Sequence, residues 1–267
     1  MEKIRLDVWL VQNGHAGGRA AACRRIEGGE VQVNGRTVKK AAFGVSPDDT
    51  IVCADPGVVY VGRGGYKLEK ALTLGLFSVE GVTALDIGAS TGGFTDCLLR
   101  NGAAKVYAVD VGHGQLHPAL CADTRVINLE GTDVRSKALC AAVAPGSVDF
   151  CCIDVSFISL KAVFPALTAY LRPRASVVCL IKPQFEAGRQ GVGKGGIVRD
   201  RKVHVRVLND VCAMLSQYGD IRCLTWSPIT GGDGNIEYLA VLEYTGQTGF
   251  AVPTQEVVSA AFEELKS

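Results

Sequence analysis

Four short apolar runs after residue 80 constrain the fold of this chain more than any other feature. They cover residues 83–87, 105–109, 148–153 and 176–181, and helix-length segments separate them. Strand-sized runs that alternate with helical segments are typical of a mostly parallel sheet with helices on both faces. We therefore predict an α/β fold for this part of the chain.

Charged residues gather where these runs end. Asp86 lies in the first run, just before a glycine-rich turn, and the next three runs end at Asp110, Asp154 and Lys182. In open α/β sheets, ligands bind outside the carboxyl ends of the strands. A shared site explains charges in four such places better than burial does.

The first 58 residues have a different pattern, that of a small α+β unit. Residues 6–12 and 19–26 look helical, and Asn34-Gly35 is a strong hairpin signal between two short strands. A further strand is expected at residues 50–53. We predict three segments: a small unit at 1–58, a glycine-containing flexible linker at 59–65, and a larger domain at 66–267.

Positive charge is local in this chain. Lys and Arg total 28 against 27 Asp and Glu, yet residues 17–40 carry six basic and two acidic side chains. Such a face suits phosphates, although charge alone leaves a merely solvated face equally open. Candidate RNA contacts are Arg5, Arg19, Arg24, Arg25, Arg36, Lys39 and Lys40, with Arg63 in the linker and Arg189 in a glycine-rich loop at 186–196. That loop follows Lys182 and is predicted to be a substrate lid, with a plain surface loop as the alternative.

The glycine-rich turn at residues 85–94 admits three interpretations. Its glycines fall at 88, 92 and 93, which does not match the G-x-G-x-x-G spacing of dinucleotide-binding folds. Ser90 fits the G-x-S-x-G nucleophile elbow of serine hydrolases, but that chemistry needs a histidine downstream. Only His113, His117 and His204 follow, and none lies in an evident catalytic loop.

The third interpretation is a nucleoside-containing cofactor. Asp110 can accept hydrogen bonds from both ribose hydroxyls, and Asp133 from an adenine amino group. Asp133 fits a simple turn residue as well. The helix starting near Gly93 would point its amide groups at the ligand. The candidate cofactor residues are Asp86, Gly88, Ser90, Thr91, Gly92, Gly93, Phe94, Asp110, Val111 and Asp133.

Motifs along almost the whole chain resemble one family. The segments GRGGYKLEKAL, ALDIGASTGGFTDCLL, VYAVDVGHGQL, DFCCIDVSFISL and LIKPQFEAGR are similar to the TlyA-type, hemolysin A-like proteins, and GGEVQVNGRTVKK resembles the hairpin of an S4 RNA-binding domain. The resemblance implies an FtsJ-type, Rossmann-like methyltransferase sheet with S-adenosylmethionine as cofactor. It implies methylation of a ribose 2′-hydroxyl, of a cytidine in this family, with ribosomal RNA or ribosomal subunits as partners. The catalytic tetrad that it implies is Lys67, Asp154, Lys182 and Glu237.

The chemistry of such a reaction explains why these residue types are needed. A ribose hydroxyl holds its proton tightly, so methyl transfer needs a base beside it. A solvated lysine has a pKa of about 10.4, and burial or a neighbouring cation lowers the pKa of such an amine. Lys182 is the hypothesised base, with Lys67 as its neighbour and the two acids orienting the lysines. Orientation alone can supply much of the rate.

Other classes are disfavoured. The ten cysteines include no C-x-x-C pair, so no metal site is predicted. No apolar run approaches the roughly 18–20 residues of a membrane span, and the N-terminal residues lack the apolar core of a signal peptide. We expect a cytoplasmic protein without membrane partners, and its oligomeric state is not predicted. The alternatives are a non-catalytic RNA-binding or ribosome-assembly factor, then a serine hydrolase or a pore-forming hemolysin.

Overall fold

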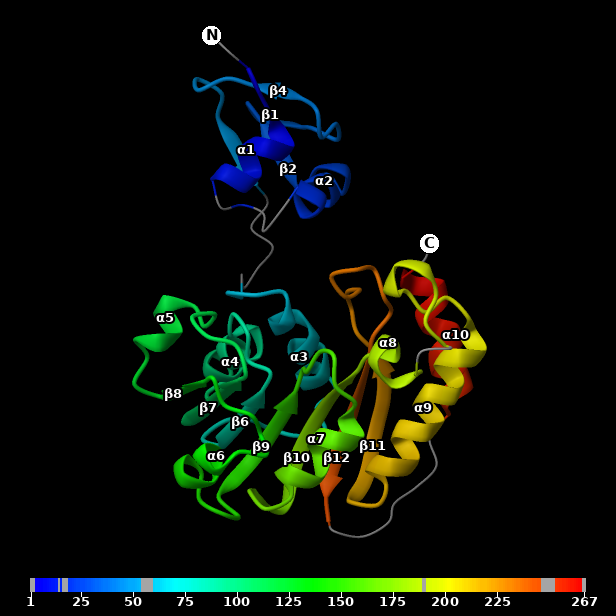
Figure 1. The fold of residues 1–267 in the computed structure, drawn as a ribbon. Coiled ribbons are helices and arrows are strands. Elements are labelled where there is room, and N and C mark those ends of the chain that lie inside the picture. Colours follow the sequence, from blue (N-terminus) through cyan, green and yellow to red (C-terminus); the bar gives the residue numbers. More distant parts are fainter. Residues whose placement is uncertain are drawn as a thin grey trace. The chain divides into compact units, whose positions relative to one another are not determined.

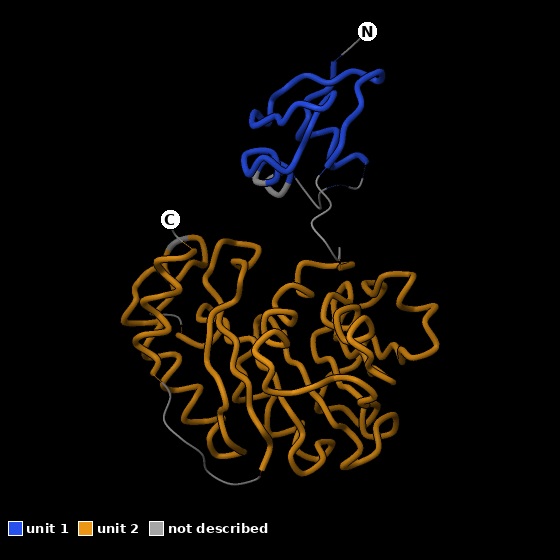
Figure 2. The backbone as a smooth tube through the Cα atoms, turned by 180° about the vertical axis from the view of Figure 1, so that it is seen from behind, with its two compact units in different colours: residues 1–59 blue, residues 60–267 orange. Residues whose placement is uncertain are grey.

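The computed structural model describes residues 3–13, 15, 19–53, 60–188, 191–245 and 253–265, apart from the side chains of residues 20, 21, 24 and 194. The chain divides into two compact units, residues 1–59 and 60–267 (Figure 2). Each unit has its own hydrophobic core, so each is described by itself.

The first unit packs two helices against short strands. Its elements are β1 (Ile4–Arg5), α1 (Leu6–Gln12), α2 (Arg19–Glu27), β2 (Val31–Val33), β3 (Arg36–Thr37), β4 (Gly44–Val45) and β5 (Ile51–Cys53). Leu6 and Leu10 of α1 and Ala22 and Ile26 of α2 are fully buried. Residues four apart lie on one helix face, so each pair forms an apolar stripe that the other helix covers.

A tight turn joins β2 to β3. Asn34 and Gly35 have φ values of 51° and 75°. Positive φ at both central residues is the geometry of a type I′ hairpin turn, which Asn-Gly favours. The hairpin predicted from this dipeptide is therefore confirmed. The β1–β4 pair was not predicted, because its strands have only two residues each.

A seven-stranded sheet forms the centre of the second unit. Its strands are β6 (Thr83–Ile87), β7 (Lys105–Asp110), β8 (Val126–Glu130), β9 (Val148–Ile153), β10 (Leu171–Ile181), β11 (Gly219–Trp226) and β12 (Tyr238–Tyr244). Their order is β11-β12-β10-β9-β6-β7-β8, as the labels of Figure 1 run across the sheet. The strands from β10 to β8 are parallel, and β12 runs antiparallel to both β10 and β11.

Helices cover both faces of this sheet, as predicted. They are α3 (Gly64–Thr73), α4 (Gly93–Arg100), α5 (Pro118–Cys121), α6 (Lys137–Ala142), α7 (Leu160–Leu167), α8 (Pro183–Glu186), η2 (Lys194–Gly196), α9 (Arg201–Leu215) and α10 (Thr254–Leu265). Phe150 and Cys152 of β9 join a core with α3, α4 and α5. Cys151 and Ile153 join the opposite core with α6, α7, α9 and α10. Alternate strand residues point to opposite faces, so one run of apolar residues serves two cores.

The linker predicted at residues 59–65 is wrong for residues 60–65. Tyr60 is buried at 6% exposure, and the Val61 amide donates a hydrogen bond to Asp96 on α4. Gly64 and Gly65 begin α3. A Cβ atom on Gly65 would lie 2.2 Å from Cγ of Tyr60, so this glycine serves close packing rather than a flexible joint.

Within the described residues, no helix combines the length and apolar character that crossing a membrane requires.

We predict that Gly65→Ala destabilises the second unit more than Gly64→Ala. The first substitution forces a methyl group into the Tyr60 ring, whereas the second meets Phe94 at 3.2 Å, where a small shift suffices. Overpacking of this kind costs roughly 1–3 kcal/mol. Urea unfolding of both variants measures the difference. Equal losses of unfolding free energy would show that Tyr60 has room to move.

Candidate active site

Four charged side chains from distant parts of the chain form a continuous series of ion pairs. Lys182 Nζ lies 2.6 Å from Oδ1 of Asp154, and Lys67 Nζ lies 3.7 Å from its Oδ2. Lys67 also donates a hydrogen bond of 2.6 Å to Oε2 of Glu237. The structure thus brings together all four residues that the motifs identified, in the order Lys182–Asp154–Lys67–Glu237.

Each member of this series is held by a different element. Lys67 lies on α3, Asp154 directly follows β9, Lys182 follows β10 and precedes Pro183, and Glu237 precedes β12. Lys67 and Lys182 are 8% and 9% exposed, and Glu237 is 2% exposed. Buried charges are costly unless paired, so the alternation of two cations and two anions is what permits this burial.

One glycine brings the glycine-rich turn against the series. Gly88 follows β6 with a φ of +84°, and a Cβ there would lie 2.3 Å from the carbonyl oxygen of Asp154. The Asp154 amide donates to the carbonyl of Ile87. The turn and the acid therefore share a backbone contact that a side chain would prevent.

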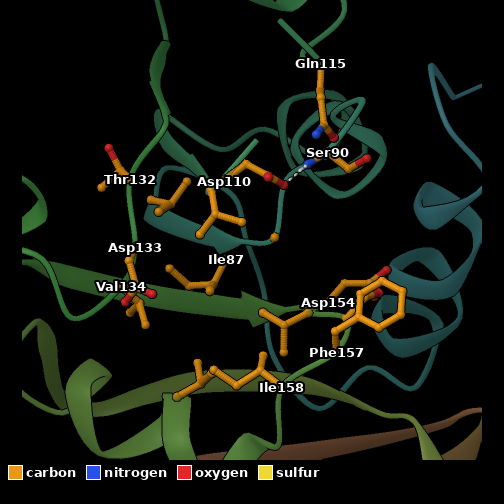
Figure 3. Close-up of a pocket in the computed structure, with 16 residues that line it drawn as sticks. Ile87, Ser90, Asp110, Gln115, Thr132, Asp133, Val134, Asp154, Phe157 and Ile158 are labelled. Carbon is orange, nitrogen blue, oxygen red and sulfur yellow. Dashed lines mark hydrogen bonds between the residues drawn. The ribbon is translucent and has the colours of Figure 1, made fainter. Parts of the chain in front are cut away.

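A cavity of about 360 Å³ opens at the carboxyl ends of β6, β7, β8 and β9 (Figure 3). On one wall, Asp110 accepts hydrogen bonds from the amides of Ser90, at 2.8 Å, and Gly112, at 2.7 Å. Val111 beside it is 68% exposed. A carboxylate offers about four acceptor positions, so Asp110 retains capacity for hydroxyl groups.

Asp133 lines the same cavity next to Thr132, whose amide donates to the Asp110 carbonyl at 2.9 Å. Its carboxylate accepts hydrogen bonds from the backbone and side chain of Arg135, which lower the pKa of Asp133 to about 2. Its carbonyl accepts from the amide of Ser136. Asp133 is therefore a turn residue that also lines the cavity, and its contact with an adenine amino group stays a prediction.

A second cavity of about 200 Å³ adjoins the first and is more polar in its lining residues. Arg63 and Lys67 line it together with the start of α4. The two cavities share Gly88, Ser90 and Asp154. Asp154 thus connects the ion-pair series to both spaces.

Two of the ten predicted cofactor residues, Asp86 and Gly92, line neither cavity. Asp86 is fully buried and accepts a hydrogen bond of 2.7 Å from Thr95 on α4. Burial raises the pKa of Asp86 to about 7. This acid thus contacts α4 from within the core. The other eight predicted residues line one or both cavities.

Several lining residues were missed by sequence reasoning. Ser156 accepts a hydrogen bond of 3.0 Å from Lys182, and Phe157 is 90% exposed with a φ of 63°. Both follow Asp154 in a motif already singled out, so that proximity was an available signal. Gln115 likewise lies in a quoted motif, VYAVDVGHGQL, five residues after Asp110. Glu130 holds its loop by accepting from the Gln115 and Leu116 amides, which lower the pKa of Glu130 to about 2.

The serine hydrolase interpretation gains no support. His117 accepts a hydrogen bond from the Ala119 amide, and His204 is buried between Tyr238 and the Val198 carbonyl. The ring of His113 lies beside Gly131. Among the described residues, none of these contacts joins a histidine ring to the Ser90 side chain, although the His117 amide donates to the carbonyl of the adjacent Thr91. In the described part of the chain, no three His, Cys, Asp or Glu side chains gather as a metal site would require.

Most of the predicted RNA contacts are exposed. Arg5, Arg19, Arg36, Lys39, Lys40 and Arg63 all reach solvent. Arg25 differs, because it is 19% exposed and donates to Glu30 and to the His15 carbonyl. The Arg24 side chain and Arg189 lie outside the described residues.

One end of the predicted lid loop is anchored. Asn235, which is 1% exposed, accepts a hydrogen bond from the Val198 amide and donates one to the Gly196 carbonyl, each at 3.0 Å. The loop's end is therefore fixed to the segment that precedes Glu237.

Comparison with known proteins identifies relatives of both units. The FtsJ-like methyltransferase family matches residues 60–244 and the S4 domain matches residues 4–51. A Bacillus subtilis protein provisionally named rRNA methyltransferase YqxC is 45% identical, over 100% of this chain and 95% of its own. The 16S/23S rRNA (cytidine-2′-O)-methyltransferase TlyA of Mycobacterium tuberculosis is 40% identical over 88% of each chain. A solved Streptococcus thermophilus structure, provisionally named a hemolysin, matches with a TM-score of 0.77 and 43% identity, covering 100% and 98% of the two chains.

We predict that Asp86 makes stability fall as pH rises. Its pKa is raised from 3.8 to about 7 in the folded chain, so below pH 4 its contribution is fully present, and it is lost as pH rises through 7. Asp86→Asn keeps an oxygen that can accept from Thr95 but does not ionise. The variant should therefore be more stable than the parent at pH 8, and this difference in unfolding free energy should be smaller at pH 5. Urea midpoints at both pH values test this, and an equal change at the two would exclude Asp86 as the source.

Proposed function

The chain belongs to the FtsJ-like methyltransferase family, in its TlyA-type branch with an S4 domain, and we propose that it methylates a ribose 2′-hydroxyl of ribosomal RNA. The observation that carries this proposal is the Lys182–Asp154–Lys67–Glu237 series beside the larger cavity. The name of the Mycobacterium tuberculosis relative supports cytidine as the methylated nucleotide. The proposal does not specify its position in the ribosomal RNA.

The residues of the larger cavity fit S-adenosylmethionine. Asp110 retains acceptor positions for the two ribose hydroxyls after binding two backbone amides. Val111 exposes an apolar side chain inside a cavity, where an adenine ring would cover it. Asp133 offers a carboxylate for the adenine amino group. The smaller cavity shares Ser90 and Asp154 with the larger one and leads to Lys67.

When bound, the cofactor supplies an electrophilic methyl group on a sulfonium. The chain must then orient the hydroxyl and remove its proton. Lys182 is our proposed base, because Asp154 at 2.6 Å and Ser156 at 3.0 Å hold its amine in one place. A positioned base of this kind contributes roughly a hundredfold or more to a rate.

Lys67 keeps the charges balanced during that proton transfer. Asp154 faces both lysines, so it still has a cationic partner when Lys182 is neutral. Glu237 anchors Lys67 at 2.6 Å from a position that is almost fully buried. The pair Lys67–Glu237 is therefore a fixed support, and Lys182 is the member that changes its protonation.

The S4 unit supplies the nucleic-acid side of the proposal. Its exposed basic residues suit the phosphates of structured RNA, which dominate the affinity of such contacts. We propose ribosomal subunits as partners and the cytoplasm as the place of action. The mutation effects below separate this enzyme from an assembly factor that keeps the fold without catalysis.

We predict that Lys182→Ala loses methyl transfer while it keeps cofactor affinity. Removing the base should lower the rate roughly a hundredfold or more. The measurement is tritium transfer from S-adenosylmethionine to purified small and large ribosomal subunits, with calorimetry for cofactor binding. Lys161→Ala, which changes an exposed lysine on α7, is the matched control and should behave as the parent.

The outcomes of that experiment distinguish the hypotheses. Equal loss of cofactor affinity and activity would remove Lys182 from the role of base. No incorporation by the parent into either subunit or into free ribosomal RNA, with cofactor binding intact, would favour the assembly factor.

We predict separately that Asp110→Asn weakens cofactor binding by roughly tenfold or more, the effect of losing hydrogen bonds to a charged acceptor. Asp123→Asn is the control, since Asp123 pairs with Arg125 and lines neither cavity. Unchanged binding by Asp110→Asn would place the ribose elsewhere.

A further inference from the structure

Asp7 is a covered carboxylate that binds two of the predicted RNA-contacting arginines of the first unit, Arg5 and Arg19. It lies on α1 and is 0% exposed. Its Oδ1 accepts from Arg5 Nε at 3.0 Å, and its Oδ2 accepts from Arg5 Nη2 at 2.9 Å and from Arg19 Nη2 at 3.0 Å. The two arginines hold the pKa of Asp7 well below its usual range, so the carboxylate stays ionised.

The two arginines remain open to solvent although they bind this acid. Their side chains are 49% exposed for Arg5 and 64% exposed for Arg19. A guanidinium carries five N–H donors in a rigid fork. Arg5 donates two hydrogen bonds to Asp7 and Arg19 donates one, so the remaining N–H groups of both side chains can bind another acceptor.

A shared acceptor also fixes where the two groups lie. Both guanidinium groups donate to the same oxygen of Asp7, so they lie side by side. Two cations so close repel each other unless an anion lies between them. Asp7 is that anion, and it comes from the helix that packs against α2, on which Arg19 lies.

We propose that Asp7 is a positioning residue for RNA binding: it holds Arg5 and Arg19 as a preformed pair for the backbone phosphates of ribosomal RNA. This inference rests on the proposed function. Arginine forks match the geometry of phosphate oxygens, and a pair that is already ordered loses less side-chain entropy on binding. Asp7 itself touches no RNA in this proposal.

The proposal and a simple account of charge predict opposite changes in RNA affinity for Asp7→Asn. If the basic face binds RNA only through its total charge, then an acid within it weakens binding, and Asp7→Asn strengthens it. If Asp7 orders the arginines, then Asp7→Asn weakens binding although the face becomes more positive. The sign of the change therefore separates the two explanations.

The experiment uses the full chain with purified large and small ribosomal subunits as probes, and measures binding over a range of salt concentrations. We expect Asp7→Asn to bind roughly tenfold more weakly, with a shallower salt dependence because fewer phosphates are neutralised. Glu27→Gln is the matched control. It removes an exposed acid at the end of α2, and we expect equal or tighter binding.

Two further variants separate positioning from folding. Leu10→Ala removes a fully buried side chain from the same helix and lowers stability without touching the arginines. We expect it to bind normally below its melting temperature. Arg19→Lys keeps the charge but has one nitrogen in place of a fork, so it should bind more weakly than the parent. This variant carries the test if Asp7→Asn does not fold.

The results overturn the inference in distinguishable ways. Suppose the parent chain binds and methylates the subunits, and folded Asp7→Asn binds them as tightly or more tightly. That result would refute the positioning role of Asp7 and leave the proposed function intact. Parental affinity of Arg19→Lys would do the same. If the parent chain neither binds nor methylates the subunits, the proposed function fails and this inference fails with it.

Discussion

The carboxylate of Asp154 lies between two lysine ammonium groups, and the geometry of the site depends on it. Lys67 and Lys182 come from a helix and a strand end on different parts of the sheet, and both are nearly buried. Without the acid, two like charges would face each other in a region of low dielectric constant. Gly88 then contacts the backbone of the same residue from the glycine-rich turn, so the larger cavity and the ion pairs share one backbone contact.

The sheet and its ligand-binding edge could be predicted from the sequence because both follow from local patterns. Strand-length apolar runs placed Asp110 and Asp154 at one edge, where the structure has them. Glu237 could not be found that way. It meets Lys67 across 170 residues, and only the motif resemblance indicated it. Asp86 shows the converse limit, since an acid before a glycine-rich turn looks the same in sequence whether it faces a ligand or the core. The glycines at residues 62–65 were predicted to form a flexible linker for a similar reason, because flexible joints and closely packed backbones both favour glycine.

Both units contain a carboxylate that binds two cationic side chains. In each, one carboxylate is shared by two cationic side chains, Arg5 and Arg19 on Asp7 and the two lysines on Asp154. In the first unit the cations are about half exposed, and in the second they are nearly buried. Exposure leaves donors for the proposed RNA phosphates, whereas burial would keep the proposed base in one place. The two arrangements therefore differ both in the exposure of the cations and in their kind, arginine in the first unit and lysine in the second.

The position of β12 in the sheet has a consequence for the order in which a newly made chain matures. This strand is inserted between β10 and β11, and Glu237 at its start is the last member of the ion-pair series to leave the ribosome. Domains tend to fold from the N-terminus during synthesis, so the S4 unit is complete while Lys67 on α3 still lacks its closest charged partner, Glu237. Under the proposed function, a partly made chain gains its capacity to hold RNA before its capacity for chemistry, and methylation awaits the completed sheet.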